Sequence, residues 1–282
     1  MNYHIIYFSH KILTKLTKVT RVKKVNEFSN KLIERYLNEK YQPNINNYDL
    51  KSKGYPADKK IWFCWLQGID EAPKLVRDCL KSIESNIPDD YQINIIDDNN
   101  YHNYVVLNDY IIKKYNDGII SKAQFSDILR INLLSEYGGL WVDSTINIKN
   151  KNFIKNMVDG RCFSLASENF QLPSISLGRW TGFFFFTSKN NPAVNYMKDY
   201  FNNYWKYENK LINYFLIDYI FSITYEKFEN FRRDIIDNSL PGDNKYFMSD
   251  LMTKKKLNNG EDYLLSKDKV GIFKLSHKIN YK

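Results

Sequence analysis

The chain has 282 residues, of which 43% are hydrophobic and 26% are charged, and its formal net charge is +9. These values exclude a disordered chain, because enough apolar side chains are present to form a sizeable core. The length suits one large α/β domain with small additions, or two small domains. No run of about 18 apolar residues occurs, so we expect no membrane-spanning helix.

The cysteines and the first residues bear on the compartment. Cys64, Cys79 and Cys162 are scattered and form no metal-binding motif. This pattern indicates buried thiols in a reducing compartment, and a structural zinc site is not expected. The first 19 residues lack the clean apolar core and cleavage site of a secretory signal. We therefore expect a cytoplasmic protein.

The first 40 residues are predicted to be helical, and they hold nine Lys or Arg against three Glu. One interpretation is peripheral contact with anionic lipid headgroups on the inner face of the cell membrane. The other is a solvated basic helix pair. Nucleic-acid binding is not expected, because no nucleic-acid module accompanies the charge. Two prolines and one glycine in residues 41–59 predict a linker, so residues 1–57 are a helical extension and residues 58–282 the main domain.

Short apolar segments then alternate with a helix. Lys60–Leu66 and Gln92–Ile96 are predicted to be buried strands, and a helix is predicted at 73–85 between them. Strand, helix and strand within about 35 residues form a βαβ unit with parallel strands. Ligands of such sheets bind beyond the carboxyl ends of the strands, which points to the loops after Leu66 and Ile96.

The second half continues this alternation. A helix is predicted at Ser121–Tyr137, ended by Gly138, and a short strand at Leu140–Val142 places Asp143 at its end. Residues 144–148 are expected to continue extended, and the last 40 residues show no clear pattern. Further strands are predicted at 161–167 and 180–187, and further helices at 192–207 and 209–224.

Two charged residues fall in a helix that is apolar on nearly all sides. Asp127 and Arg130 lie three positions apart, on one face of it. A buried charge is costly unless it is paired or bound to a ligand. The pair is therefore either a structural ion pair or a binding site. In a site, arginine would suit phosphate or sugar hydroxyls, and aspartate would accept hydrogen bonds from sugar hydroxyls.

The segment GGLWVDST, residues 138–145, follows that helix. Its two glycines allow a sharp turn and a close approach of the backbone to a ligand. Asp143, at the ligand-binding end of its strand, can hold Mg²⁺ or Mn²⁺ against diphosphate oxygens. The alternative is an aspartate that caps a turn.

Here the sequence resembles a known family. The run AQFSDILRINLLSEYGGLWVDST is similar to the signature of DXD-containing sugar transferases. It is most similar to the capsular polysaccharide synthesis proteins of bacteria, and more distantly to glucosylating toxin domains. KIWFCWLQG, IIDDNNY, YFLIDYIF and FKLSHK resemble further elements of the family, so the resemblance covers about residues 58–282. The matching positions are Ser126, Asp127, Arg130, Gly138, Gly139 and Asp143.

The resemblance implies a GT-A fold, which is a Rossmann-like, nucleotide-sugar-binding mixed sheet flanked by helices. It implies a glycosyltransferase of capsular or exopolysaccharide biosynthesis. Such an enzyme moves a sugar from a nucleoside-diphosphate sugar to a hydroxyl of a saccharide acceptor, here on a lipid carrier. The implied catalytic residues are Asp143, Asp127 and Arg130; the implied donor-binding residues are Trp65, Leu66, Gln67, Asp98, Trp141, His277 and Lys278; the implied metal ligands are Asp143 and Thr145.

Individual roles follow from the same resemblance. Trp65 would stack on the base, and Trp141 on the ribose or the sugar. Asp127 and Arg130 would hold the donor sugar. His277 and Lys278 would offset the charge of the diphosphate. Each has a plainer alternative: Trp65 as a core tryptophan, His277 as a solvated histidine, and Asp97 or Asp98 as turn formers.

One position departs from the family's D-x-D motif, because Thr145 stands where the second aspartate is usual. A hydroxyl is a weaker metal ligand than a carboxylate. Either Asp143 alone holds Mn²⁺ or Mg²⁺ with phosphate and water, or the dependence on metal is reduced. Two alternative functions stay open, a non-catalytic sugar-nucleotide binder and a basic module that binds membranes or nucleic acid. Asp218, in an aromatic segment, either positions an acceptor or is a buried, hydrogen-bonded carboxylate.

Overall fold

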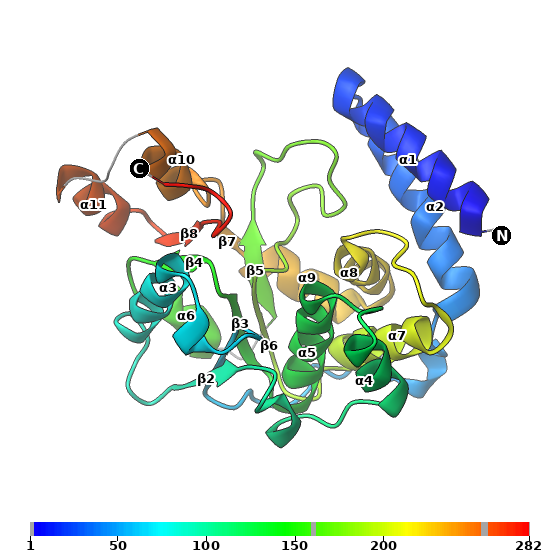
Figure 1. Ribbon diagram of the computed structural model, residues 1–282, viewed down its shortest axis with the longest axis horizontal. Coiled ribbons are helices and arrows are strands. Elements are labelled where there is room, and N and C mark those ends of the chain that lie inside the picture. The colour runs from blue at the N-terminus through cyan, green and yellow to red at the C-terminus, as the bar shows by residue number, and fades with distance from the viewer. Residues whose placement is uncertain (1–2, 159–161, 255–258, 282) are drawn as a thin grey trace.

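A computed structural model describes residues 3–158, 162–254 and 259–281 of the chain (Figure 1). A six-stranded mixed sheet lies at its centre, in the order β2-β1-β3-β6-β5-β7. β1 pairs in parallel with β2 and β3, as the predicted βαβ unit requires, and β6 is antiparallel to β3 and β5. The strands are β1 (Lys60–Cys64), β2 (Gln92–Ile96), β3 (Gly139–Asp143), β5 (Phe163–Ala166), β6 (Phe184–Thr187) and β7 (Leu240–Pro241).

The central strands are apolar on both faces, so the sheet separates two cores. Trp62 and Trp141, paired across β1 and β3, belong to the larger core. Ile61 and Leu140, their neighbours in the strands, belong to the second core on the opposite face. Successive side chains of a strand point to opposite faces, and burial on both faces explains why these strands read as continuous apolar runs.

Helices cover both faces of the sheet (Figure 1). Six of the helices named below contribute buried side chains to the larger core, and α3 and α6 pack with the second. The larger core includes side chains of α2 (Lys23–Tyr41), α4 (Asp109–Asn116), α5 (Lys122–Tyr137), α7 (Pro192–Tyr207), α8 (Leu216–Lys227) and α9 (Glu229–Asn238). The second includes those of α3 (Lys74–Glu84) and α6 (Ile154–Val158), and short 3₁₀ helices lie at Ile45–Asn47, Ile69–Glu71 and Tyr101–Asn103.

The C-terminal segments form a smaller unit beside the sheet. β4 (Ile146–Ile148) leaves the end of β3 and pairs antiparallel with β8 (Ile272–Lys274). α10 (Phe247–Lys254) and α11 (Asn259–Ser266) precede β8 in the chain. Phe273 of β8 packs with Cys79 of α3 in a small third core. The pairing brings a segment from the end of the chain next to the end of β3.

The predicted helical segment forms two helices within residues 3–41, α1 (Tyr3–Thr20) and α2. The chain reverses at Arg21, whose φ is 57°. α2 is part of the larger core, because Ile33 and Leu37 are buried there. Asn30 of α2 also accepts a hydrogen bond from the Tyr219 hydroxyl of α8 at 3.1 Å. Among the described residues, no helix combines the length and the apolar character needed to cross a bilayer.

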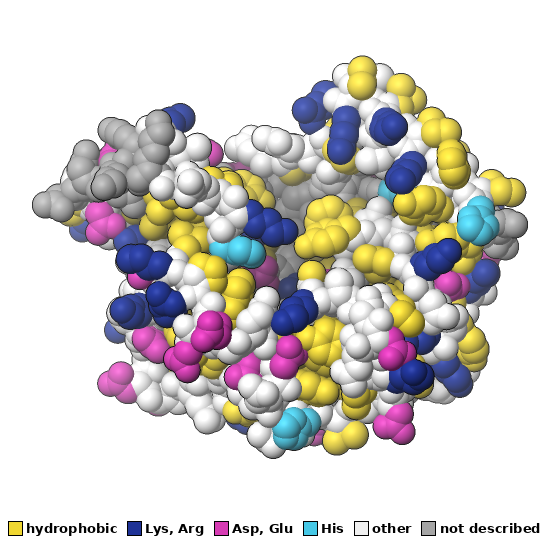
Figure 2. Space-filling model, in the orientation of Figure 1, with side chains coloured by type: hydrophobic (Ala, Val, Ile, Leu, Met, Phe, Trp, Pro, Cys, Tyr) yellow, Lys and Arg dark blue, Asp and Glu magenta, His cyan; other side chains and the backbone are white. Residues whose placement is uncertain are grey.

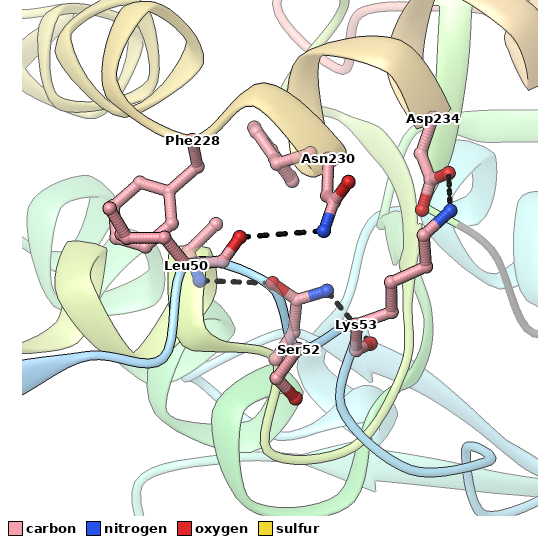
Figure 3. A pocket seen from close by; sticks show the side chains of 9 residues that line it. Leu50, Ser52, Lys53, Phe228, Asn230 and Asp234 are labelled. Atoms are coloured by element: carbon pink, nitrogen blue, oxygen red, sulfur yellow. Dashed lines mark hydrogen bonds and ion pairs between the residues drawn. The ribbon is translucent and has the colours of Figure 1, made fainter.

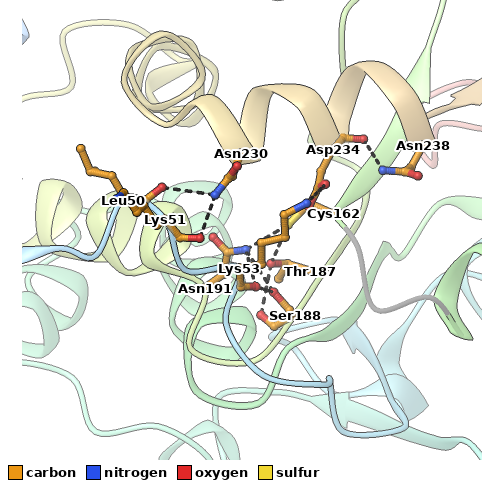
Figure 4. A network of polar contacts seen from close by, with 10 residues as sticks. All are labelled: Leu50, Lys51, Lys53, Cys162, Thr187, Ser188, Asn191, Asn230, Asp234 and Asn238. Atoms are coloured by element: carbon orange, nitrogen blue, oxygen red, sulfur yellow. Dashed lines mark hydrogen bonds and ion pairs between the residues drawn. The ribbon is translucent and has the colours of Figure 1, made fainter.

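The predicted linker is held in place by polar contacts (Figures 3 and 4). Asn230 of α9 donates to the carbonyl oxygen of Lys51 at 2.9 Å, and Lys53 pairs with Asp234 at 3.3 Å. The backbone of Lys53 is also bound by the side chains of Ser188 and Asn191. A cavity beside these contacts measures about 10 Å³, which is room for about one water. The contacts therefore fix the linker, and the cavity is too small for a sugar.

Several predicted boundaries were wrong: β1 ends at Cys64 rather than Leu66, and residues 144–145 form a turn before β4. The apolar run 180–187 is a strand only from Phe184 onwards. The helix predicted at 209–224 begins at Leu216. The Tyr204 hydroxyl donates to the Lys210 carbonyl at 2.6 Å and accepts from the Ile212 amide at 2.8 Å, which holds the preceding segment as a loop. β5 agrees with the predicted strand at 161–167, whose first residue lies outside the described residues.

Gly139 shows how tightly β3 is packed. Its φ is 92°, and an added Cβ would lie 2.4 Å from the carbonyl oxygen of Lys60. Gly118 also has a positive φ, of 72°, but an added Cβ would have open space around it. We expect Gly118→Ala to cost only the backbone strain of about 1–2 kcal/mol.

Gly139→Ala adds a clash with backbone, so we expect it to lower the free energy of unfolding by at least about 3 kcal/mol. Urea unfolding followed by circular dichroism measures both variants. Equal losses in the two variants would contradict the tight packing inferred at β3.

Candidate active site

Four charged side chains form a continuous row of ion pairs at the carboxyl end of β3. Arg130 of α5 lies between two carboxylates: its Nη2 is 3.2 Å from Asp127 Oδ1 and 3.0 Å from Asp143 Oδ1. Lys274 of β8 contacts the second oxygen of Asp143, with Nζ 2.8 Å from Oδ2. We call Asp127, Arg130, Asp143 and Lys274 the charge cluster.

The local structure fixes Arg130. Its guanidinium group lies 4.8 Å from the centre of the Trp141 ring, and its Nη1 donates to the Gly182 carbonyl oxygen at 2.8 Å. The indole Nε1 of Trp141 donates to Asp143 Oδ1 at 2.8 Å. Arg130 is buried, whereas a quarter of the Asp143 side chain is exposed. The accessible part of the charge cluster is therefore the Asp143–Lys274 pair.

The carboxylates of this region differ in their affinity for protons. Burial opposes the ionisation of Asp143, but Lys274 and Arg130 more than offset it and hold its pKa well below the usual range. Burial raises the pKa of Asp127 to about 7 despite Arg130, and it raises the pKa of Asp218 to about 6. Asp143 is therefore a fixed anion at neutral pH, while Asp127 and Asp218 titrate near neutrality. Such divergent carboxylates are typical of functional sites.

A large open cavity of about 930 Å³ adjoins the charge cluster. Gly182, whose carbonyl binds Arg130, lines it, and so does Asp218, which accepts a hydrogen bond from Trp180 Nε1 at 3.1 Å. Figure 2 shows the molecule hollowed between the C-terminal segments and the N-terminal helices. The volume of the cavity is in the range of ligand-binding sites. Its aromatic lining comprises Phe170, Trp180, Phe183, Tyr214, Phe215, Tyr219 and Tyr246.

Two residues predicted to bind the nucleotide lie side by side. The ring centres of Trp65, after β1, and of His277, after β8, are 5.3 Å apart, with the rings nearly perpendicular. The Nε1 of Trp65 is buried and has no hydrogen-bond partner in the described part of the chain. Burial, and then the charges of Lys278 and Lys274, lower the pKa of His277, so its ring is neutral at pH 7. Lys278 follows it and is exposed.

The loops after β1 and β2 place the other predicted donor contacts. Leu66 is buried, and its carbonyl accepts from the amide of Asp98 at 3.1 Å. The Asp98 carboxylate accepts from the Tyr115 hydroxyl at 2.7 Å and lies 3.6 Å from Lys122, so it joins β2 to α4 and α5. Gln67 is exposed at the loop. Nucleotide contacts by these three residues stay predictions.

Asp97 agrees with its plainer alternative, and Trp141 is buried. Asp97 forms a turn, because its Oδ1 accepts from the Asn99 amide at 2.8 Å. Trp141 is only 1% exposed and has Arg130 over its ring, so it offers no face for a ribose or sugar. The predicted stacking is replaced by a different role, because Trp141 positions Arg130 and Asp143.

The residues present suit a divalent metal poorly. Both oxygens of Asp143 are already bound to cations, and Thr145 is 6% exposed, with its carbonyl bonded to the Leu275 amide at 2.8 Å. Within residues 3–158, 162–254 and 259–281, no three His, Cys, Asp or Glu side chains group as a metal site. Mg²⁺ and Mn²⁺ prefer several oxygen ligands. A metal at Asp143 would have to displace Lys274.

Sequence reasoning missed Lys274. It is the first lysine of KLSHK, but only the pairing of Ile146 with Lys274 in the β4–β8 sheet carries it back to the end of β3. The nearest available signal was the strand-like run GIFK, residues 271–274, in which a lysine follows apolar residues. Gln124 was missed as well; its amide donates to Asp127 Oδ2 at 3.3 Å and to the Tyr214 carbonyl at 2.9 Å.

A family model described as capsular polysaccharide synthesis protein matches residues 12–282. The match begins well before residue 58, so it includes much of α1 and all of α2. Among solved structures, the chain is similar to a "PaToxG Glycosyltransferase", with a TM-score of 0.41 and 14% identity over 91% of this chain and 92% of that chain. No curated protein matches.

The raised pKa of Asp127 predicts how stability depends on pH. A carboxyl whose folded pKa is about 7, against an ordinary value of 3.8, stabilises the fold at low pH. That contribution is lost as the pH rises from about 4 through about 7. Relative to Asp127→Asn, the wild-type free energy of unfolding should therefore fall over this range, by about 1.4 kcal/mol for each increase of the pH by one.

Urea unfolding at a series of pH values measures this difference. Asp237→Asn, at an exposed position on α9, is the matched control and should follow the wild type. A difference between the Asp127→Asn and wild-type proteins that stays constant with pH would contradict the raised pKa.

Proposed function

The chain belongs to the capsular polysaccharide synthesis protein family, and we propose that it is a glycosyltransferase with a GT-A-type site. It moves a sugar from a nucleoside-diphosphate sugar to an acceptor hydroxyl. One observation carries the proposal: the charge cluster lies at the carboxyl ends of parallel strands, beside a cavity large enough for a sugar. Ligands of α/β sheets bind at this edge.

The donor is assigned to the side of the charge cluster that carries Trp65. The base lies against Trp65 and His277, which are adjacent and belong to two different segments. The diphosphate lies near Lys274 and Lys278, and the sugar reaches towards Asp127. Arg130 is buried and bound on several sides, so its role is to position the two aspartates. This differs from the direct sugar contact expected from the sequence.

The acceptor is assigned to the large cavity. Its aromatic and polar lining suits a saccharide, because aromatic rings pack on sugar rings while polar groups bind hydroxyls. The acceptor oxygen bonds to the anomeric carbon, and the bond from that carbon to the diphosphate oxygen breaks. The nucleoside diphosphate leaves with the bonding electrons. Asp218, which lines the cavity and has a pKa of about 6, accepts the proton of the hydroxyl.

Lys274 is assigned the charge that stabilises the departing diphosphate. Its Nζ is bound to a carboxylate that is partly exposed, so it can exchange that partner for a phosphate oxygen. Fixed positive charge at a leaving group is among the larger contributions to catalysis. A divalent metal at Asp143 stays the alternative carrier of this charge, and the two differ in their response to chelation.

Donor binding and hydrolysis test the proposal directly. We expect at least one of a panel of nucleoside-diphosphate sugars to raise the melting temperature and to bind in calorimetry. Asp143→Ala should lower donor hydrolysis by about 100-fold or more. Asp262→Ala, at the exposed end of a surface ion pair, should leave it unchanged. No stabilisation by any donor, or equal hydrolysis by the Asp143→Ala variant, would count against a glycosyltransferase.

The second test separates Lys274 from a metal. We expect hydrolysis by the wild type to persist in EDTA, and Lys274→Ala to lose about 100-fold in EDTA. Mn²⁺ should restore part of the Lys274→Ala activity, because Asp143 Oδ2 is then free to bind it. Lys149→Ala is the control, because Lys149 forms a surface ion pair next to the β4–β8 sheet; it should hydrolyse donor like the wild type. A wild type that is inactive in EDTA, together with an unaffected Lys274→Ala variant, would assign the charge to a metal.

A further inference from the structure

One face of α1 is an exposed apolar stripe. Five large side chains spaced three or four residues apart point away from the protein, and they are 45–83% exposed. At 100° per residue they fall within an arc of about 80°. The stripe consists of Ile5, Phe8, Ile12, Leu16 and Val19. An apolar surface of this regularity is typical of an interaction site.

Basic residues border the stripe along one side. Lys11, Lys15 and Lys18 follow it around the helix, and α1 contains no acidic residue. Figure 2 shows apolar side chains along the outer edge of the N-terminal helices, with Lys and Arg side chains beside them. An apolar face next to lysines is the pattern of helices that lie in the interface of anionic membranes.

On the side of the lysines that faces away from the stripe, α1 borders the large cavity. His10, Thr14 and Lys18 of α1 line it, while Ile6 and Thr17 face the protein and are buried. Around α1 there are thus, in order, a buried side, the wall of the cavity, the lysines and the stripe. A surface that covers the stripe would also lie at the rim of the cavity.

We propose that α1 lies flat on an anionic membrane surface, with the stripe inserted among the lipids and the lysines at the headgroups. A second copy of the chain is a less suitable occupant, because packing two stripes together would bring two rows of lysines side by side. The charges instead complement a negative surface. Val22, just before α2, and Phe28 in α2 are also exposed.

This placement deepens the proposed function, on which the following step rests. A cavity whose rim lies at the bilayer receives a saccharide acceptor whose carrier is embedded in that bilayer. The donor side of the charge cluster does not depend on α1. Membrane binding should therefore favour transfer to a lipid-linked acceptor over hydrolysis of the donor, which needs no membrane.

Co-sedimentation of the full chain with vesicles tests the inference without any donor. We expect binding to vesicles of equal parts phosphatidylcholine and phosphatidylglycerol, weaker binding to phosphatidylcholine alone, and weaker binding at high salt. Phe8→Ser with Ile12→Ser should weaken the binding by at least about tenfold. Lys11→Gln with Lys15→Gln should weaken binding to the anionic vesicles alone.

Val106→Ser with Ile236→Ser is the matched control, since these apolar side chains are exposed outside α1; it should bind like the wild type. The circular dichroism spectrum of the Phe8→Ser, Ile12→Ser variant should equal that of the wild type, which shows that the variant is folded, and so should its donor hydrolysis without vesicles. Equal vesicle binding by the stripe variant and the wild type would overturn the inference. So would self-association in sedimentation velocity that the stripe variant abolishes, without any vesicle binding. Absence of donor hydrolysis in every variant would count against the proposed function and leave the vesicle result standing.

Discussion

The arrangement of the site depends on one carboxylate, Asp143, which is shared by two cations. Arg130 reaches it from α5, and Lys274 reaches it from β8. The interaction joins the middle of the chain to its C-terminal segment at the edge of the sheet where ligands bind. Burying an arginine is costly unless anionic groups pair with it. Asp127 and Asp143 are these partners, and their contacts with Arg130 fix the position of the cluster.

The sheet makes this interaction possible. Alternation along β3 sends Trp141 into the larger core, against Arg130, and sends Leu140 and Val142 into the other. Asp143 follows at the end of the strand, with its amide bonded to the Phe183 carbonyl at 2.8 Å. Phe183 and Gly182 then line the large cavity. The packed core and the open cavity therefore meet where the end of β3 is bonded to the residues that precede β6.

The N-terminal helices connect the large cavity with the protein surface. α2 is fixed in the larger core through Ile33 and Leu37, and it carries α1 beside the cavity. The family model matches from residue 12 onwards, so most of the two helices lies within the region that the family model describes. One helix supplies both a wall of the proposed acceptor site and an exposed apolar face, so binding to a surface and access to the site are coupled by geometry.

The sequence was enough to predict the parallel β1–β2 unit, the buried helix α5 with its turn at Gly138, and the proximity of Asp127, Arg130 and Asp143. These features depend on local periodicity and on spacings of a few residues, which are visible in a single chain. It did not predict the contact of Lys274 with Asp143, the burial of Trp141 under Arg130, or the loop that precedes the start of α8 at Leu216. Those depend on the pairing of β4 with β8 and on side-chain packing between segments that are distant in the sequence, and such contacts leave no local pattern in the chain.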